Sequence, residues 1–237
     1  MKIKLFTIPN LLTLSNLLCG ALGVVAACVC GDLTLAFYLM VLAAVFDFLD
    51  GFVARLLGQS GPLGVQLDSL ADDITFGLLP ATVLFVLGSR MPSLWSMPWW
   101  AMYGVFVLAA FSALRLARFN IDDTQHTEFR GLPTPAAALF CGALGMLCER
   151  YDATIAGEAI LAVAAVLSLL LVSPVRMFSL KFHGFGWQGN EVRYPFLVAC
   201  AVLLAALRAW AIPAIIVLYV AISTVRWALQ SLKSADK

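Results

Sequence analysis

Long apolar stretches alternate with short polar connections along almost the whole chain. A membrane-spanning helix needs about 20 predominantly apolar residues, and eight stretches approach or reach this length. We therefore predict an all-α, polytopic membrane protein with about eight transmembrane helices, six in a core and two added at the C-terminal end. The break at Arg208 between the last two stretches is short, so seven spans are the alternative. The predicted spans are Leu11–Val29, Leu33–Leu57, Gly64–Leu87, Trp99–Leu116, Pro133–Cys148, Ala156–Val172, Tyr194–Leu207 and Ala209–Leu229.

Composition agrees with this pattern. The chain is 62% hydrophobic and 12% charged, whereas a soluble domain carries about 25% charged residues. The net charge of +1 argues against a nucleic-acid partner. The six cysteines lack the paired spacing of a zinc site. We find no internal repeat, and residues 1–237 are predicted to form a single transmembrane domain.

The lysines and arginines are distributed unevenly between the two predicted sides of the membrane. With eight spans, all but three of the 15 fall on the side of the termini, and the exceptions are Arg90, Arg150 and Arg208. Cytoplasmic loops are enriched in lysine and arginine. Both termini are therefore predicted to lie in the cytoplasm.

Two of the predicted spans contain acidic residues, which membrane helices usually avoid. The second span ends with Asp47 and Asp50, and the third begins with Asp68 and Asp72. Inserting each acid into the membrane costs about 2.5–3.5 kcal/mol on insertion scales. A cost of this size indicates that the acids have a function. Spacings of three and four place each pair on one helical face. The short connection at 56–63 makes the two helices antiparallel neighbours, so we expect the four carboxylates to meet near the cytoplasmic surface.

Facing carboxylates without basic partners are typical of sites for divalent cations, and oxygen-only ligands favour Mg²⁺ or Mn²⁺. Four acids could hold two ions about 3.5–4 Å apart, an arrangement that clamps both oxygens in phosphoryl transfer. The small residues Gly51, Ala54 and Gly64 leave room beside the helix backbone, and Arg55 offers a fork for a phosphate. These features favour a lipid-phosphate substrate. An acid-lined cation transporter is the alternative, but it leaves the glycine, alanine and arginine pattern unexplained.

The pattern resembles the full signature of the CDP-alcohol phosphotransferase family, whose eight fixed positions match without a gap at Asp47, Asp50, Gly51, Ala54, Arg55, Gly64, Asp68 and Asp72. The resemblance implies a transferase in which two divalent ions bind the four aspartates. It implies that Asp72 is also the base that deprotonates the acceptor alcohol. It further implies a homodimer, and a site for the CDP-linked lipid formed by Asn10, Thr13, Asp50, Gly51, Ala54, Arg55 and Gly64.

Within that family, the chain is similar over nearly its whole length to bacterial and archaeal phosphatidylserine synthases. The matching stretches are Ile8–Thr13, Gln66–Asp72, Thr75–Ala81, Leu114–Asn120 and Gly131–Ala136. The resemblance implies that CDP-diacylglycerol and L-serine are the substrates, and that phosphatidylserine and CMP are the products. Glycerol 3-phosphate and inositol are the alternative acceptors. Asp73 departs from the family pattern, in which we expect an apolar residue.

Serine carries a carboxylate that needs a basic partner. Arg115, Arg118 and Asn120 follow one another at the cytoplasmic end of the fourth span and are the candidates for serine binding. Anchoring at the cytoplasmic surface is the alternative role for the two arginines.

Overall fold

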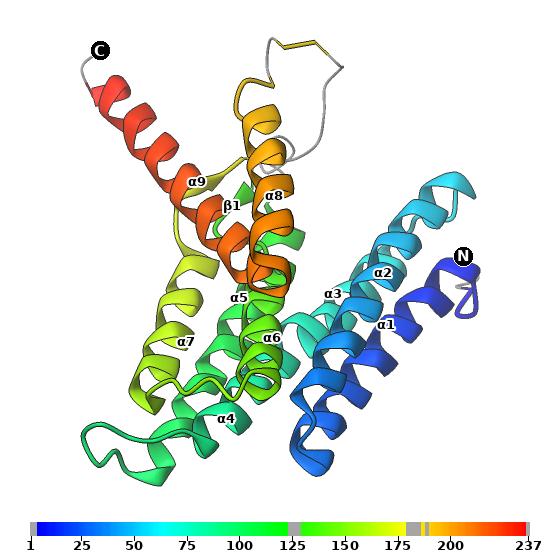
Figure 1. The fold of residues 1–237 in the computed structure, drawn as a ribbon. Helices are drawn as coiled ribbons and strands as arrows, with labels where there is room; N and C mark the ends of the chain where they lie inside the picture. The colour runs from blue at the N-terminus through cyan, green and yellow to red at the C-terminus, as the bar shows by residue number, and fades with distance from the viewer. Residues whose placement is uncertain (1–3, 123–128, 179–185, 188–189, 236–237) are drawn as a thin grey trace.

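The computed structural model describes residues 4–122, 129–178, 186–187 and 190–235. Most of these residues are helical (Figure 1). The α-helices are α1 (Ile8–Val25), α2 (Leu33–Leu56), α3 (Pro62–Asp72), α4 (Leu79–Arg90), α5 (Val107–Ile121), α6 (Thr134–Arg150), α7 (Gly157–Val172), α8 (Arg193–Leu207) and α9 (Ala211–Ala235). The π-helical stretches are η1 (Ala26–Cys30) and η2 (Asp73–Leu78), and the 3₁₀ stretches are η3 (Trp99–Phe106) and η4 (Arg208–Trp210).

Length and apolar character make five of the described helical stretches able to cross a membrane: Ile8–Cys30, Leu33–Leu56, Pro62–Arg90, Trp100–Ile121 and Arg193–Leu232. Gly157–Val172 is apolar but shorter. The prediction of an all-α membrane protein is thereby confirmed, while the number of eight spans stays a prediction. Lys2, Lys181 and Lys237, which contribute to the predicted charge asymmetry, lie outside the described residues.

One small sheet was not expected from the sequence. Strands β1 (Phe129–Arg130) and β2 (Arg176–Met177) pair antiparallel, with Phe129 opposite Met177. The pair joins the connections that follow α5 and α7.

Local capping sets where the first two helices begin. The Thr7 hydroxyl accepts a hydrogen bond from the backbone N–H of Asn10, and the Asp32 carboxylate accepts one from that of Leu35 at 2.6 Å. Such side-chain acceptors satisfy donors that the first turn of a helix leaves unpaired. Helices α1 and α2 then run side by side in opposite directions (Figure 1). The C-terminal part of α2 therefore lies beside the N-terminal part of α1.

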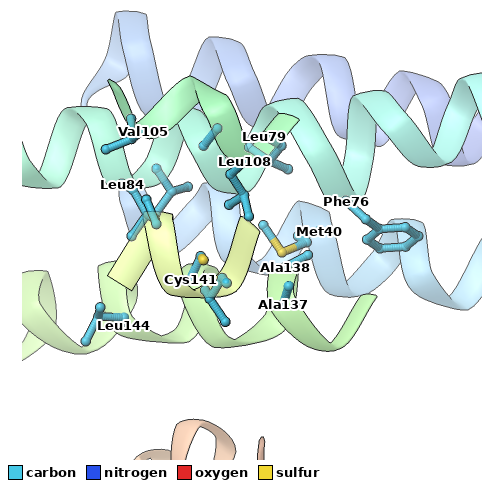
Figure 2. Packing of buried hydrophobic residues seen from close by; sticks show 14 of the residues in the cluster. Met40, Phe76, Leu79, Leu84, Val105, Leu108, Ala137, Ala138, Cys141 and Leu144 are labelled. Carbon is cyan, nitrogen blue, oxygen red and sulfur yellow. The ribbon is translucent and has the colours of Figure 1, made fainter. Parts of the chain in front are cut away.

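The apolar core surrounds α4, whose side chains are buried on most of its circumference. Leu79 and Leu84 of α4 pack with Met40 of α2, Leu108 of α5 and Cys141 of α6 (Figure 2). All five are at most 1% exposed. This packing fixes α2 relative to the continuous stretch from α3 to α4, which carries the remaining acids.

The last two helices form a V beside this core (Figure 1). The chain turns between them at Arg208, which has a φ of 51° and a ψ of −120°. The Tyr219 hydroxyl of α9 donates a hydrogen bond to the Phe178 carbonyl at 3.0 Å, which ties α9 to the connection after β2.

Candidate active site

The acids of α2 and α3 meet, as the helical spacing predicts. Asp47, Asp50 and Asp68 each present an oxygen, and these three oxygens all lie within 4.8 Å of one another. Asp50 is only 6% exposed. One carboxylate oxygen of Asp68, Oδ1, is buried without a hydrogen-bond partner among the described residues.

Asp72 adjoins this group from one turn further along α3. It lies close enough to Asp47, Asp68 and Asp50 to interact with them electrostatically, but it lies outside the compact group of three. It is 9% exposed, and its Oδ1 accepts a hydrogen bond from the amide nitrogen of Asn16 at 3.1 Å. The structure therefore brings the four predicted acids together, with Asp72 buried beside the compact group of three.

Asp73 takes a different direction from its neighbour. Its side chain lies close to Ser112 of α5, and both side chains lie over Gly77. A Cβ atom at Gly77 would stand only 2.6 Å from Asp73 Oδ1 and 2.8 Å from Ser112 Oγ. The close approach of η2 to α5 therefore requires glycine at this position, and Asp73 belongs to the contact between these two elements.

Helix α1 contributes two hydrogen bonds to the acids. Thr13 Oγ1 donates to Asp50 Oδ2 at 2.5 Å, and Asn16 Nδ2 donates to Asp72, as described above. Asn16 is fully buried, and sequence reasoning missed it. The sequence feature that could have identified Asn16 is its position as a polar residue inside an apolar span. It lies three positions after Thr13 and therefore on the same helical face.

A cleft opens beside the acids, with a volume of about 170 Å³. Its walls include every residue that the sequence predicts to contact the CDP-linked lipid, namely Asn10, Thr13, Asp50, Gly51, Ala54, Arg55 and Gly64. Gln59, Ser60 and Gly61 of the α2–α3 connection also line it and were not predicted. The acids and the cleft are thus parts of one site.

The small residues of the motif leave the cleft open. A Cβ atom at Gly51 would have Arg55 Nη1 as its nearest neighbour at 3.7 Å, and one at Gly64 would have Asn10 Oδ1 at 3.7 Å. Both distances are ordinary contacts, so neither glycine is required by protein packing. The space beside them is available to a ligand. Arg55 is exposed at the end of α2, where its guanidinium can turn toward that space.

The three serine-binding candidates occupy different environments. Arg115 is 9% exposed, interacts electrostatically with Asp72 and then Tyr219, and its Nε has no hydrogen-bond partner in the part of the chain that the structure describes. Asn120 donates a hydrogen bond to Ser69 Oγ at 2.8 Å, on α3 beside Asp68. Arg118 is exposed. Of the three, Arg115 alone is buried against the acids.

The donor set suits a hard divalent cation. It consists only of carboxylate oxygens, which Mg²⁺ and Mn²⁺ prefer. Within the described ranges, no lysine or arginine lies within ion-pair distance of the four acids. The unpartnered Oδ1 of Asp68 is a further available ligand atom. Asp47, Asp50, Asp68 and Asp72 therefore fit the metal that the motif implies.

Several known proteins are similar in sequence to this chain. The CDP-diacylglycerol–serine O-phosphatidyltransferase of Helicobacter pylori is 32% identical over 182 residues, which cover 75% of this chain and 74% of that protein. The equally named proteins of Methanocaldococcus jannaschii and Bacillus subtilis are 32% and 28% identical over 173 and 177 residues, covering 73% and 74% of this chain and 74% and 92% of those proteins. The family model for CDP-alcohol phosphatidyltransferases matches residues 6–171. The chain belongs to the CDP-alcohol phosphatidyltransferase family.

Proposed function

We propose that this protein is a CDP-diacylglycerol–serine O-phosphatidyltransferase. It transfers the phosphatidyl group of CDP-diacylglycerol to the hydroxyl of L-serine and releases CMP. The observation that carries the proposal is the union of a four-acid cluster with a cleft lined by every predicted CDP-contacting residue. The three relatives named above, all called serine O-phosphatidyltransferases, support serine as the acceptor.

The carboxylates of Asp47, Asp50, Asp68 and Asp72 would hold two divalent ions, Mg²⁺ or Mn²⁺. When bound, these ions offset the negative charge that develops on the phosphate oxygens during transfer. Gly51 and Ala54 admit the cytidine against the backbone of α2, and Asn10 and Gly64 form the facing wall of the cleft. Arg55 pairs with the diphosphate, because a guanidinium matches the geometry of phosphate oxygens.

Asp72 acts as the general base. It accepts the hydroxyl proton of serine while the serine oxygen forms a bond to the β-phosphorus of CDP-diacylglycerol. The bond from that phosphorus to the bridging oxygen breaks, and CMP leaves with this oxygen. The burial of Asp72 supports this role, because a buried proton acceptor is screened from bulk water.

Serine is oriented by the fourth span. Arg115 receives the serine carboxylate, because it is buried beside the proposed base and its Nε needs an acceptor. Asn120 and Arg118 contribute from the next turn, Asn120 through its contact with α3. The active site and both termini lie on the cytoplasmic side, as the uneven distribution of lysine and arginine indicates, and the enzyme is a homodimer, as the family resemblance implies. Residues 1–237 form one transmembrane domain.

The experiment that tests the proposal compares acceptors. Purified protein is given CDP-diacylglycerol, Mn²⁺ or Mg²⁺ and one alcohol at a time, and CMP release is measured. We expect release to depend on L-serine. Equal or greater turnover with glycerol 3-phosphate or inositol would overturn the serine assignment while keeping the reaction class.

A further inference from the structure

Two hydrogen bonds from one face of α1 reach one acid on each of the two acid-bearing helices. Thr13 donates to Asp50 of α2 at 2.5 Å, and Asn16 donates to Asp72 of α3 at 3.1 Å. Thr13 and Asn16 are three residues apart, so they project from the same side of α1. Both donors are buried, with exposures of 3% and 0%.

Independent contacts hold this face of α1 in place. Thr13 Oγ1 also lies 3.1 Å from the Pro9 carbonyl of its own helix, and the Thr75 hydroxyl of η2 donates to the Asn16 carbonyl at 3.3 Å. Gly20 lies one turn further along α1, where Thr75 occupies the space that a Cβ atom would need. The helix is thus held close to the acid-bearing segment by backbone contacts as well as by side chains.

The two acids that α1 contacts differ in their relation to the metal-binding group. Asp50 belongs to the compact group whose oxygens lie within 4.8 Å of one another, whereas Asp72 does not. The amide oxygen of Asn16 is buried and has no partner among the described residues. The bond to Asp72 is therefore the side-chain hydrogen bond that fixes the Asn16 amide, and it occupies one oxygen of Asp72 while leaving the other for chemistry.

We propose that Thr13 and Asn16 are positioning residues with separate tasks, a conclusion that rests on the proposed function. Thr13 orients Asp50 for binding the divalent cation, and Asn16 orients Asp72 for accepting the serine proton. Groups that hydrogen-bond a metal ligand set its orientation and affinity, and their loss typically costs about 10–100-fold in metal affinity or activity. Thr13 thereby gains a task beyond lining the lipid-nucleotide cleft.

The proposal is tested with the full-length enzyme in detergent. Mn²⁺ binding is measured by electron paramagnetic resonance without CDP-diacylglycerol, so that this readout is independent of turnover. Thr13→Val should weaken Mn²⁺ binding about 10–100-fold, while Thr13→Ser, which keeps the hydroxyl, should restore wild-type affinity. Thr13→Ala gives the same comparison without a branched side chain, should the valine variant not fold.

Asn16→Leu should affect turnover more than Mn²⁺ binding. We expect kcat to fall about 10–100-fold, with a smaller loss of Mn²⁺ affinity than in Thr13→Val, because Asp72 lies outside the compact group of ligands, and with the KM for serine unchanged. Ser15→Ala is the matched control, because Ser15 lies between the two residues and is only partly buried. Among the described residues, its hydroxyl donates only to the Leu11 carbonyl of its own helix, at 2.9 Å.

Two results would overturn the proposal. The first is wild-type Mn²⁺ affinity in both Thr13→Val and Thr13→Ala. The second is an Asn16→Leu enzyme in which Mn²⁺ affinity or the KM for serine changes and kcat does not. Either result would leave the proposed reaction standing, since that depends on serine-dependent CMP release by the unmodified enzyme.

Discussion

Replacing Asp72 by asparagine is expected to remove nearly all turnover, whereas the same change at the adjacent Asp73 is expected to leave most of it. Asp72 faces Asp47 and Asp68 and accepts a hydrogen bond from Asn16. Asp73 is directed at Ser112 of α5 instead. The two substitutions are identical in chemistry and adjacent in sequence. A difference in turnover between them therefore reports on whether the carboxylate belongs to the acid cluster.

The expected magnitude at Asp72 follows from what asparagine keeps and what it loses. An amide of the same shape can still accept the hydrogen bond from Asn16, so packing is preserved, but it cannot accept the serine proton. Loss of a general base costs about 10²–10⁴-fold, which corresponds to about 3–5 kcal/mol in the activation barrier. Weaker metal binding adds to this loss. At Asp73, an amide can donate to Ser112, so the contact between η2 and α5 survives.

The assay is serine-dependent CMP release by the two purified variants, with metal and both substrates at saturating concentrations. Thermal unfolding of each variant in detergent confirms that both are folded. An inactive Asp73→Asn enzyme together with an active Asp72→Asn enzyme would refute the assignment of the base and the reasoning from helical faces.

Three further predictions concern the cleft, the metal and the far end of the molecule. Gly51→Val should raise the KM for CDP-diacylglycerol about tenfold or more, because the added atoms point into the cleft and overfilling a packed contact costs about 1–3 kcal/mol. The melting temperature should not fall. An unchanged KM would contradict this position for the nucleotide. A chelator should abolish CMP release, and Mn²⁺ or Mg²⁺ should restore it; restoration by zinc alone would contradict the preference of carboxylates for hard cations. Glu149→Ala should lower the free energy of unfolding by about 1–3 kcal/mol, because its carboxylate accepts hydrogen bonds from the backbone N–H groups of Leu33 and Thr34 at 3.1 and 2.8 Å. Turnover per folded enzyme should be unchanged, since the start of α2 lies about 25 Å along the helix from Asp50; a loss of turnover without a loss of stability would contradict it.

The sequence was sufficient to predict the helical, membrane-embedded class and the meeting of the acids. Apolar length identifies the helices, and spacings of three and four between Asp47 and Asp50 and between Asp68 and Asp72 determine their common faces. The short connection between α2 and α3 then leaves little freedom in how the two faces meet. These properties depend on residues that are close together in the chain, so they can be read from a single sequence.

Features that depend on packing between distant segments were not predictable in the same way. Periodicity places Asn16 on the face of Thr13 but does not say that α3 brings Asp72 against it. The π-helical stretch η2 follows Asp72 directly, and its Gly77 lies against Ser112 of α5. Arg115 of the same helix α5 is buried. The pairing of β1 with β2 joins segments that are some 46 positions apart. Tertiary contacts decide each of these, and no local pattern encodes them.

The most direct test of the proposed function follows both halves of the reaction at once. Isotopically labelled L-serine is supplied with CDP-diacylglycerol and Mn²⁺, and the label entering the lipid fraction is compared with the CMP released. The account predicts one labelled phosphatidylserine for each CMP, with both products absent from an Asp72→Asn enzyme. CMP release without label in the lipid, or labelled lipid formed equally by the Asp72→Asn enzyme, would contradict it.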